Sequence, residues 1–142
     1  MIAYDLYAVI AKNVAELDKL LEKMSIDEIL DNYITFHGVV HVLQIIIQAL
    51  IDLGQYVISI KGQKPPSTYS EIPLILKDLE VITKSEASQF RKMIGFRNII
   101  VHRYTDLNLT IIEKILANKL YKNALEISKK LVIASKTNSK TT

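Results

Sequence analysis

The sequence predicts an all-α protein, an up-and-down bundle of about five helices. Three observations indicate this class. Apolar side chains recur at helical spacings of three and four residues along most of the chain. No alternating apolar and polar run bounded by turn residues competes with that pattern, so no strand is expected. Only 4 glycines and 3 prolines occur in 142 residues, which leaves few points where helices must end.

Composition indicates one globular domain with a substantial core, because 49% of the residues are hydrophobic and 23% are charged. The absence of cysteine excludes a disulfide framework and a thiolate zinc site. A net charge of +3 suits an anionic partner without requiring one. We expect a single helical domain over residues 1–135 and a disordered tail over 136–142, which holds no apolar residue.

A first helix is expected over residues 2–24. The Ser-Ile-Asp-Glu sequence at 25–28 has the spacing of a capping box and opens a second helix that extends to about Ile60. This second helix is either continuous or restarts near Asp31. Gly38 lies inside it at a cost of about 1 kcal/mol relative to alanine, so we expect a neighbouring helix to pack closely there.

The clear loop covers residues 61–69, where two consecutive prolines cannot continue a helix. Ser70 is expected to cap a short third helix that ends at about Ile82. This cap places Pro73 in the first turn, where the missing N–H group has no helical partner to lose.

The Thr-Lys-Ser-Glu sequence at 83–86 has a second capping-box spacing and opens the fourth helix. This helix ends in the segment 95–104. A turn follows with Asp106 or Asn108 as the next cap, and a fifth helix then extends towards Ser135.

The apolar run at residues 39–53 is long, but polar side chains interrupt it every three to four residues. They are His41, Gln44, Gln48 and Asp52. The uninterrupted stretches are much shorter than the ~20 residues that a membrane span needs. No basic segment precedes an apolar run at the start of the chain, so no signal peptide is predicted. We therefore expect a cytoplasmic protein with no membrane partner.

The end of the fourth helix concentrates polar chemistry in Arg97, Asn98, His102 and Tyr104. At about 100° per residue, Tyr104 returns to within about 20° of Arg97, and Asn98 and His102 lie about 100° and 140° away. A guanidinium group suits phosphate oxygens, and an imidazole transfers protons near neutral pH. Taken alone, His102 would be a cation favourably placed at a helix C-terminus, and Tyr104 an amphipathic residue at a helix end. Together, these residues favour chemistry at a phosphate.

Apolar side chains lie on both sides of this helix: Met93, Phe96 and Ile100 on one, and Phe90, Ile94 and Val101 on the other. Complete burial within one chain would leave Arg97, Asn98 and His102 without evident partners, which is energetically expensive. A second protomer on this face avoids that cost. The sequence therefore predicts a homodimer whose polar groups line a cleft across the interface.

The pattern Arg97-Asn98-x-x-x-His102-x-Tyr104 resembles the motif of the HEPN superfamily, particularly its HepT toxin branch. Its setting is similar as well, since the motif closes the fourth helix and a turn and a long helix follow. The long second helix, with Gln44, Gln48 and the Ile-Asp-Leu-Gly stretch, is also similar to that branch. The resemblance covers essentially the whole chain.

The resemblance implies a metal-independent endoribonuclease, the toxin of a type VII-like toxin–antitoxin pair, which needs no cofactor. The 2′-hydroxyl of the RNA substrate (tRNA or mRNA) would attack the adjacent phosphate. His102 would be the acid or base, Arg97 would hold the phosphate and Asn98 would orient the site. Tyr104 matches the tyrosine that an MntA-like nucleotidyltransferase antitoxin modifies with AMP. The expected assembly is a homodimer that can join a larger hetero-oligomer.

Two other functions fit the sequence less well. The first is a non-catalytic helical dimer that binds RNA, a nucleotide or a partner nucleotidyltransferase. The second is a dimetal bundle, because His37 and His41 have the i, i+4 spacing of metal ligands. No Glu-x-x-His motif accompanies these histidines, so they are expected in the core or an interface.

Overall fold

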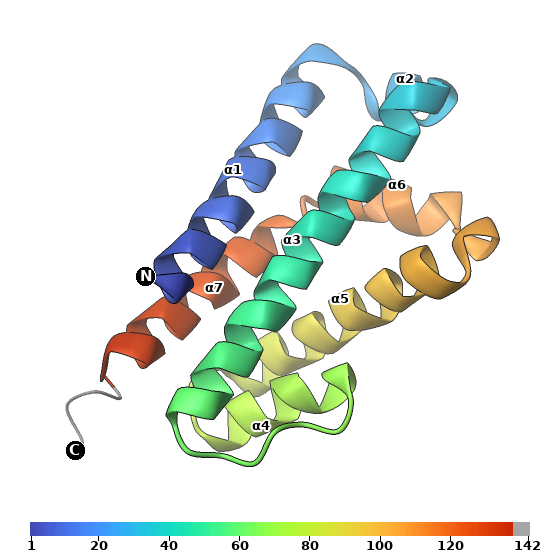
Figure 1. Cartoon of the computed structure of the whole chain (residues 1–142). Coiled ribbons are helices and arrows are strands. Elements are labelled where there is room, and N and C mark those ends of the chain that lie inside the picture. Colours follow the sequence, from blue (N-terminus) through green and yellow to red (C-terminus); the bar gives the residue numbers. More distant parts are fainter. Residues whose placement is uncertain (138–142) are drawn as a thin grey trace.

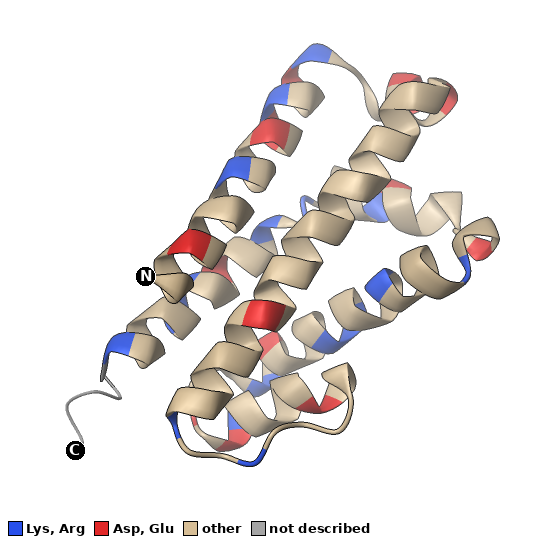
Figure 2. Ribbon diagram, in the orientation of Figure 1, with Lys and Arg blue, Asp and Glu red and all other residues tan. Residues whose placement is uncertain are grey.

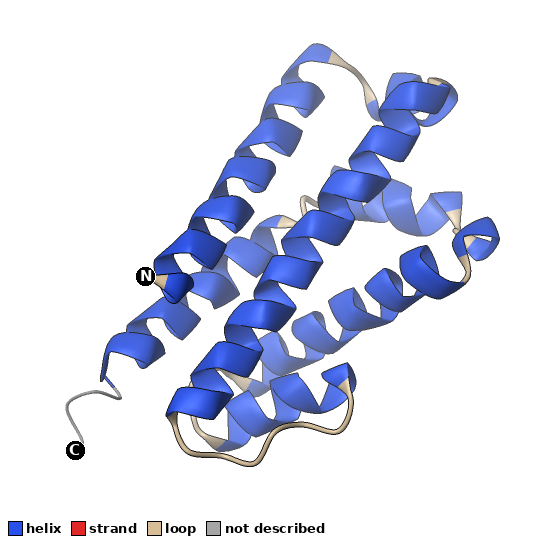
Figure 3. Cartoon of the chain, in the orientation of Figure 1, coloured by secondary structure: helices blue, strands red, loops and turns tan. Residues whose placement is uncertain are grey.

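The computed structural model describes residues 1–137, which form seven α-helices and no strand (Figures 1 and 3). The helices are α1 (Ile2–Lys23), α2 (Ile26–Asp31), α3 (Tyr33–Ile60), α4 (Ile72–Asp78), α5 (Lys84–His102), α6 (Leu109–Ala117) and α7 (Lys122–Thr137). Two 3₁₀ turns, Tyr69–Glu71 and Tyr104–Asp106, precede α4 and follow α5. The predicted all-α class is confirmed.

The long helix α3 is the centre of the fold. It packs against α1 and α7 on one side and against α4 and α5 on the other (Figure 1). By length and composition it is the one helix within residues 1–137 that could cross a membrane. Its buried side chains instead contact helices of the same chain, as those of a core helix do.

Side-chain caps begin the helices where the sequence indicates. Ser25 and Thr83 each form a complete capping box with the glutamate three residues later, at the starts of α2 and α5. The side chain of Asn32 accepts a hydrogen bond from the amide of Thr35, so the second predicted helix does restart near Asp31. Asn108, rather than Asp106, caps α6.

Two predicted helices are wrong in extent. The third was expected from Ser70 to Ile82, but Tyr69–Glu71 is a 3₁₀ turn and α4 ends at Asp78. The fifth was expected as one helix and is instead broken into α6 and α7. Glu80 follows the end of α4 and Lys119 follows the end of α6, and their positive φ values of 62° and 51° end the two helices.

The close backbone approach lies at Gly54 and not at Gly38, where we expected it. A Cβ atom on Gly38 would meet nothing within 4 Å, and the residue is exposed. A Cβ atom on Gly54 would lie 2.7 Å from Cγ2 of Ile72 and 3.7 Å from the ring of Phe90. The missing side chain therefore lets α3, α4 and α5 meet.

The chain itself covers most of both apolar sides of α5, although Val101 on the second side is 41% exposed. Phe90 and Ile94 are 0% and 1% exposed within the monomer, and Phe90 lies beside α3 and α4 residues around Gly54. A second protomer is therefore not needed to cover Phe90 and Ile94, which the chain buries by itself. The homodimer stays a prediction that needs a different basis.

The C-terminal helix α7 continues to Thr137, two residues beyond the predicted end of the domain at 135. The remainder of the predicted tail, 138–142, lies outside the described residues.

Candidate functional site

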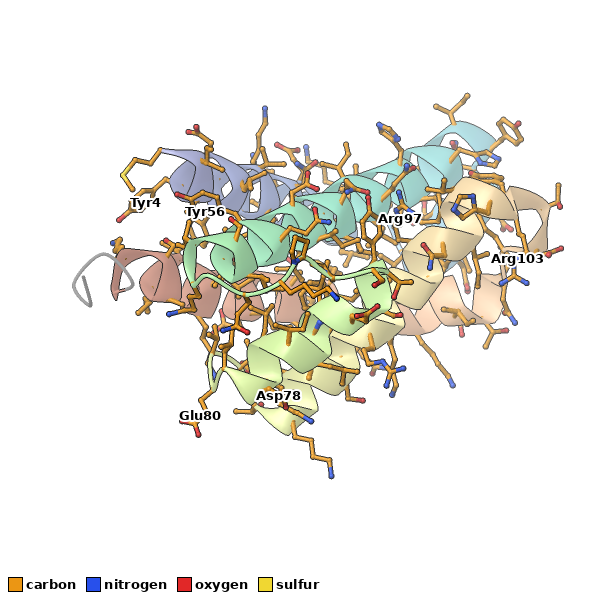
Figure 4. The ribbon with its side chains drawn as sticks, turned by 60° about the horizontal axis from the view of Figure 1, so that its bottom comes forward. Tyr4, Tyr56, Asp78, Glu80, Arg97 and Arg103 are labelled. Atoms are coloured by element: carbon orange, nitrogen blue, oxygen red, sulfur yellow. The ribbon has the colours of Figure 1, made fainter. Side chains whose placement is uncertain are left out.

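Arg97 is held between α3 and α5 by neutral groups (Figure 4). Its Nε donates a hydrogen bond to Oε1 of Gln48 at 3.1 Å, and its Nη1 donates to Oδ1 of Asn98 at 3.1 Å. The guanidinium carbon lies 5.0 Å from the centre of the Tyr69 ring, a cation–π contact. Gln48 in turn donates to Oδ1 of Asp52 at 3.0 Å, which fixes its amide with the oxygen towards Arg97.

This environment orients Arg97 without neutralising it. Among residues 1–137, no carboxylate lies within 4.0 Å of its guanidinium group. Arginine carries five N–H donors, and these two hydrogen bonds use two of them. The rest remain for an anion, and planar forked donors match phosphate oxygens.

His102 is the last residue of α5 and is exposed. It follows Arg97 by five residues, which separates the two Cα atoms by about 7.5 Å along the helix axis. An exposed imidazole exchanges protons with solvent and with a bound substrate. Arg97 and His102 therefore lie at the same end of α5, about 140° apart around the helix axis.

Tyr104 does not share a face with Arg97, contrary to the helical projection. The helix ends at His102, the next residue Arg103 has φ and ψ of −143° and 50°, and Tyr104 begins a 3₁₀ turn. The Tyr104 hydroxyl is hydrogen-bonded to Nδ1 of His37, and the two rings stack with centroids 5.5 Å apart. Tyr104 contacts α3 at His37, and Arg97 contacts it at Gln48. These two α3 residues are eleven positions apart, so the two contacts lie about 16 Å apart along that helix.

The tyrosine ring is part of an aromatic cluster at the start of α3. Tyr33 and Phe36 meet the ring of His37 edge-on, with centroids at 4.3 and 5.1 Å. Burial raises the pKa of Tyr104, and the neighbouring Tyr33 raises it further. The phenol is therefore protonated at neutral pH, while 39% of the residue remains exposed.

Three residues of this site were not predicted from the sequence: Gln48, Tyr69 and His37 lie far from α5 in the chain. Their roles depend on tertiary contacts. Gln48 did carry a signal, because it forms part of the polar edge of an otherwise apolar helix. His37 and His41 were expected as core or interface histidines. Neither lies in the core, because His37 is half-buried against Tyr104 and His41 is exposed, and the interface stays a prediction. Within the described residues no three His, Cys, Asp or Glu side chains are grouped as metal ligands.

The fold and site define a helical protein with an oriented arginine and an exposed histidine at the end of one helix. Residues 10–131 match the family described as ribonuclease HepT-like, and the chain belongs to this family. The resemblance to the HepT branch of the HEPN superfamily is thereby confirmed.

The relatives agree with this assignment. The chain is 27% identical over 122 residues to a candidate RNase of Archaeoglobus fulgidus, which covers 78% of this chain and 92% of the relative. A toxin–antitoxin crystal structure with AMP-PNP has a TM-score of 0.82 at 21% identity, over 92% of this chain and 97% of the other. A tri-AMPylated HEPN toxin of Shewanella oneidensis in complex with its MNT antitoxin has a TM-score of 0.79 at 22% identity, over 96% and 97%. These likenesses show a shared fold.

Proposed function

We propose that this protein is a metal-independent endoribonuclease and the toxin of a toxin–antitoxin pair. The observation that carries the proposal is the state of Arg97. Two amides and an aromatic ring orient its guanidinium group, and donors stay free about 1.4 helical turns before the exposed His102. Membership of the HepT-like ribonuclease family supports RNA as the substrate.

In the proposed reaction the 2′-hydroxyl oxygen of RNA attacks the adjacent phosphorus, and the bond from phosphorus to the 5′-oxygen of the next nucleotide breaks. The products are a 2′,3′-cyclic phosphate and a 5′-hydroxyl. Arg97 holds the phosphate and stabilises the charge that develops on its oxygens. His102 removes the proton of the attacking hydroxyl or supplies the proton of the leaving oxygen, and Asn98 keeps Arg97 in place. This in-line chemistry needs orientation and proton transfer.

A homodimer would supply both proton-transfer roles, because two copies of His102 would act as the base and the acid. Exposed apolar side chains near the site favour such an interface: Ile34 at the start of α3 is 77% exposed, and Val101 beside His102 is 41% exposed. A chain that remains monomeric by light scattering at micromolar concentration would contradict the dimer.

The proposed antitoxin is a nucleotidyltransferase, in a complex formed in the cytoplasm. Transfer of AMP from ATP would join the Tyr104 oxygen to the α-phosphorus and release pyrophosphate. The Shewanella oneidensis complex, in which an AMPylated HEPN toxin is bound to an MNT antitoxin, supports this partner. A bulky anion on Tyr104 would lie at the end of the α3–α5 seam and repel RNA.

Cleavage is tested by incubating the purified protein with tRNA and with mRNA in EDTA. We expect wild type to cut at least one of them, and His102→Ala and Arg97→Ala to lose activity by at least about a hundredfold. Lys12→Ala on α1 is the matched control for the loss of one positive charge, and it should cut normally. Absence of cleavage by wild type, or undiminished cleavage by both site variants, would defeat the nuclease proposal. If wild type bound RNA without cutting it, the non-catalytic module would be favoured.

Modification is tested separately by co-expressing the toxin with the nucleotidyltransferase and measuring intact mass. We expect additions of the mass of AMP on Tyr104, and none on Tyr104→Phe. An unmodified Tyr104 in a neutralised complex would reject modification and leave steric occlusion by the antitoxin.

A further inference from the structure

A second polar feature lies on the α4 side of α5. A groove of about 470 Å³ runs between α4 and α5, with Ser70 and Leu74 on one wall and Ser88 on the other. Asn98 also lines this groove, and Asn98 is the residue that accepts a hydrogen bond from Arg97. The groove therefore reaches the proposed cleavage site.

The lining of the groove is basic. Lys77 of α4 and Lys84, Arg91 and Lys92 of α5 contribute four cations, and no aspartate or glutamate of the described chain lines it. Figure 2 shows basic residues along α5, and the positions 84, 88, 91, 95 and 98 place the lining residues on one face of that helix. Fourteen residues separate Lys84 from Asn98, so this face is about 21 Å long.

Most of these cations lack a carboxylate partner. Lys77 lies 3.8 Å from a carboxylate oxygen of its exposed neighbour Asp78, whereas none of the other three has such a partner within residues 1–137. Apart from Asp78, the described acidic residues nearby do not pair with the groove cations. Glu86 pairs with Lys130 of α7, and Figure 4 places Asp78 and Glu80 at the end of α4 away from Arg97.

A polyanion fits this groove better than a second copy of the chain. A symmetric interface here would bring two sets of four cations together without compensating carboxylates, and like charges repel. A nucleic-acid strand carries one phosphate per nucleotide and releases counterions as each phosphate meets a cation.

We propose that the groove between α4 and α5 binds the phosphates of the RNA strand outside the cleaved bond and leads the strand past Asn98 to Arg97. The contact is to the backbone, so it adds affinity for RNA of any sequence. This inference rests on the proposed nuclease function, and it assigns the substrate a path that begins at Lys84.

The test measures binding in a His102→Ala background, which keeps the RNA intact. A fluorescent single-stranded RNA of roughly 20 nucleotides is titrated by anisotropy at several salt concentrations. The groove variant carries Lys84→Ala, Arg91→Ala and Lys92→Ala. The control carries Lys12→Ala, Lys19→Ala and Lys23→Ala on α1, which removes the same charge from exposed positions away from the groove.

We expect the groove variant to bind RNA at least about tenfold more weakly. A plot of the logarithm of the binding constant against the logarithm of salt concentration should become shallower by about 2, since each of three lost phosphate contacts on a single strand contributes about 0.7. The control should change the affinity by less than about twofold. Equal losses in the two variants would show that only net charge matters and would overturn the groove. Unchanged binding in the groove variant would overturn it as well.

A second measurement separates this inference from the nuclease proposal. A dinucleoside monophosphate carries only the phosphate that is cleaved, which Arg97 holds, so it has no phosphate left for the groove. The groove variant with His102 restored should therefore cleave it at the wild-type rate while its KM for long RNA rises. If wild type cleaves neither substrate, the nuclease proposal fails, and the anisotropy result still decides whether the groove binds RNA.

Discussion

The hydroxyl of Tyr104 is hydrogen-bonded to Nδ1 of His37, and the two rings stack at an interplanar angle of 24°. This contact joins the turn after α5 to the start of α3. It fixes the tyrosine while leaving part of the ring accessible. In the tautomer whose Nδ1 carries no proton, the imidazole of His37 accepts the phenol proton, which Tyr104 would have to lose in the proposed AMPylation.

Replacing His37 with phenylalanine should slow AMP addition to Tyr104 by at least about tenfold. The substitution keeps an aromatic ring for stacking and removes the acceptor, while burial continues to raise the pKa of the phenol. The rate is measured by mass spectrometry with purified antitoxin and ATP. Tyr33→Phe is the control, because it removes a hydroxyl from the same cluster and leaves the hydrogen bond in place. Since Tyr33 raises the pKa of Tyr104, this control should not slow the reaction. An unaltered rate in His37→Phe would show that the imidazole only packs.

Gln48 should govern the activity of Arg97 without contacting RNA. Gln48→Leu removes the acceptor of the Arg97 Nε donor, and a hydrogen bond to a charged group contributes about 1.5–3 kcal/mol, so we expect at least about a tenfold loss of kcat. Gln48→Glu should also lose activity, for a different reason: a carboxylate would pair with Arg97 and compete with the phosphate.

The two Gln48 variants are separated by substrate binding. Gln48→Glu should raise KM more than Gln48→Leu does, because the new carboxylate repels the phosphate. Circular dichroism confirms that both are folded. Wild-type kcat in both variants would remove Gln48 from the site.

Asp18 and Tyr121 form a pH-dependent link between α1 and the residue that precedes α7. The Tyr121 hydroxyl donates to Oδ1 of Asp18 at 2.5 Å, and Lys122 lies 3.0 Å from the other oxygen. Burial opposes the charged form of Asp18, but the hydrogen bonds from Tyr121 and Lys122 outweigh it and lower the pKa of the carboxyl. Burial and the same hydrogen bond raise the pKa of Tyr121.

These two shifts set the pH window of the link. Because the pKa of the Asp18 carboxyl is lowered, its contribution to stability is present above the ordinary value near 4 and is lost as the pH falls through the pKa of the folded state. Because the pKa of the Tyr121 phenol is raised, its contribution is present below about 10 and is lost as the pH rises through the pKa of the folded state. Asp18→Asn should therefore cost about 1 kcal/mol at pH 7, or about 3 °C in Tm, and the gap to wild type should close at acidic pH. A gap that is constant from pH 3 to pH 7, monitored by thermal unfolding, would assign the effect to packing.

Local signals predicted where helices begin better than where they end. Caps with a specific side-chain chemistry, such as Ser25 and Thr83, are visible in the sequence. Three helices end in a Schellman motif with a left-handed residue, and only Gly62 among the three is the glycine that normally marks it. Glu80 and Lys119 adopt the same conformation without that signal, so the ends of α4 and α6 were missed.

The site shows the same division. Arg97, Asn98 and His102 could be predicted as site residues because they share one short segment, and their roles stay a prediction. The neighbours Gln48 and Tyr69 could not be predicted, since only the packing of α3 and the turn before α4 brings them to Arg97. Contacts between distant segments leave no periodic trace.

The two glycines of α3 should respond to alanine in opposite directions. Gly54→Ala would place Cβ 2.7 Å from Cγ2 of the fully buried Ile72, a branched side chain with little freedom to move, so we expect a loss of about 1–3 kcal/mol in the free energy of unfolding. Gly38→Ala meets nothing within 4 Å and should gain up to about 1 kcal/mol from helix propensity. Urea unfolding of both variants measures the difference. Stabilisation by Gly54→Ala would show that α4 moves freely on α3. A lower free energy of unfolding for Gly38→Ala would indicate that a partner protomer packs closely against this exposed position.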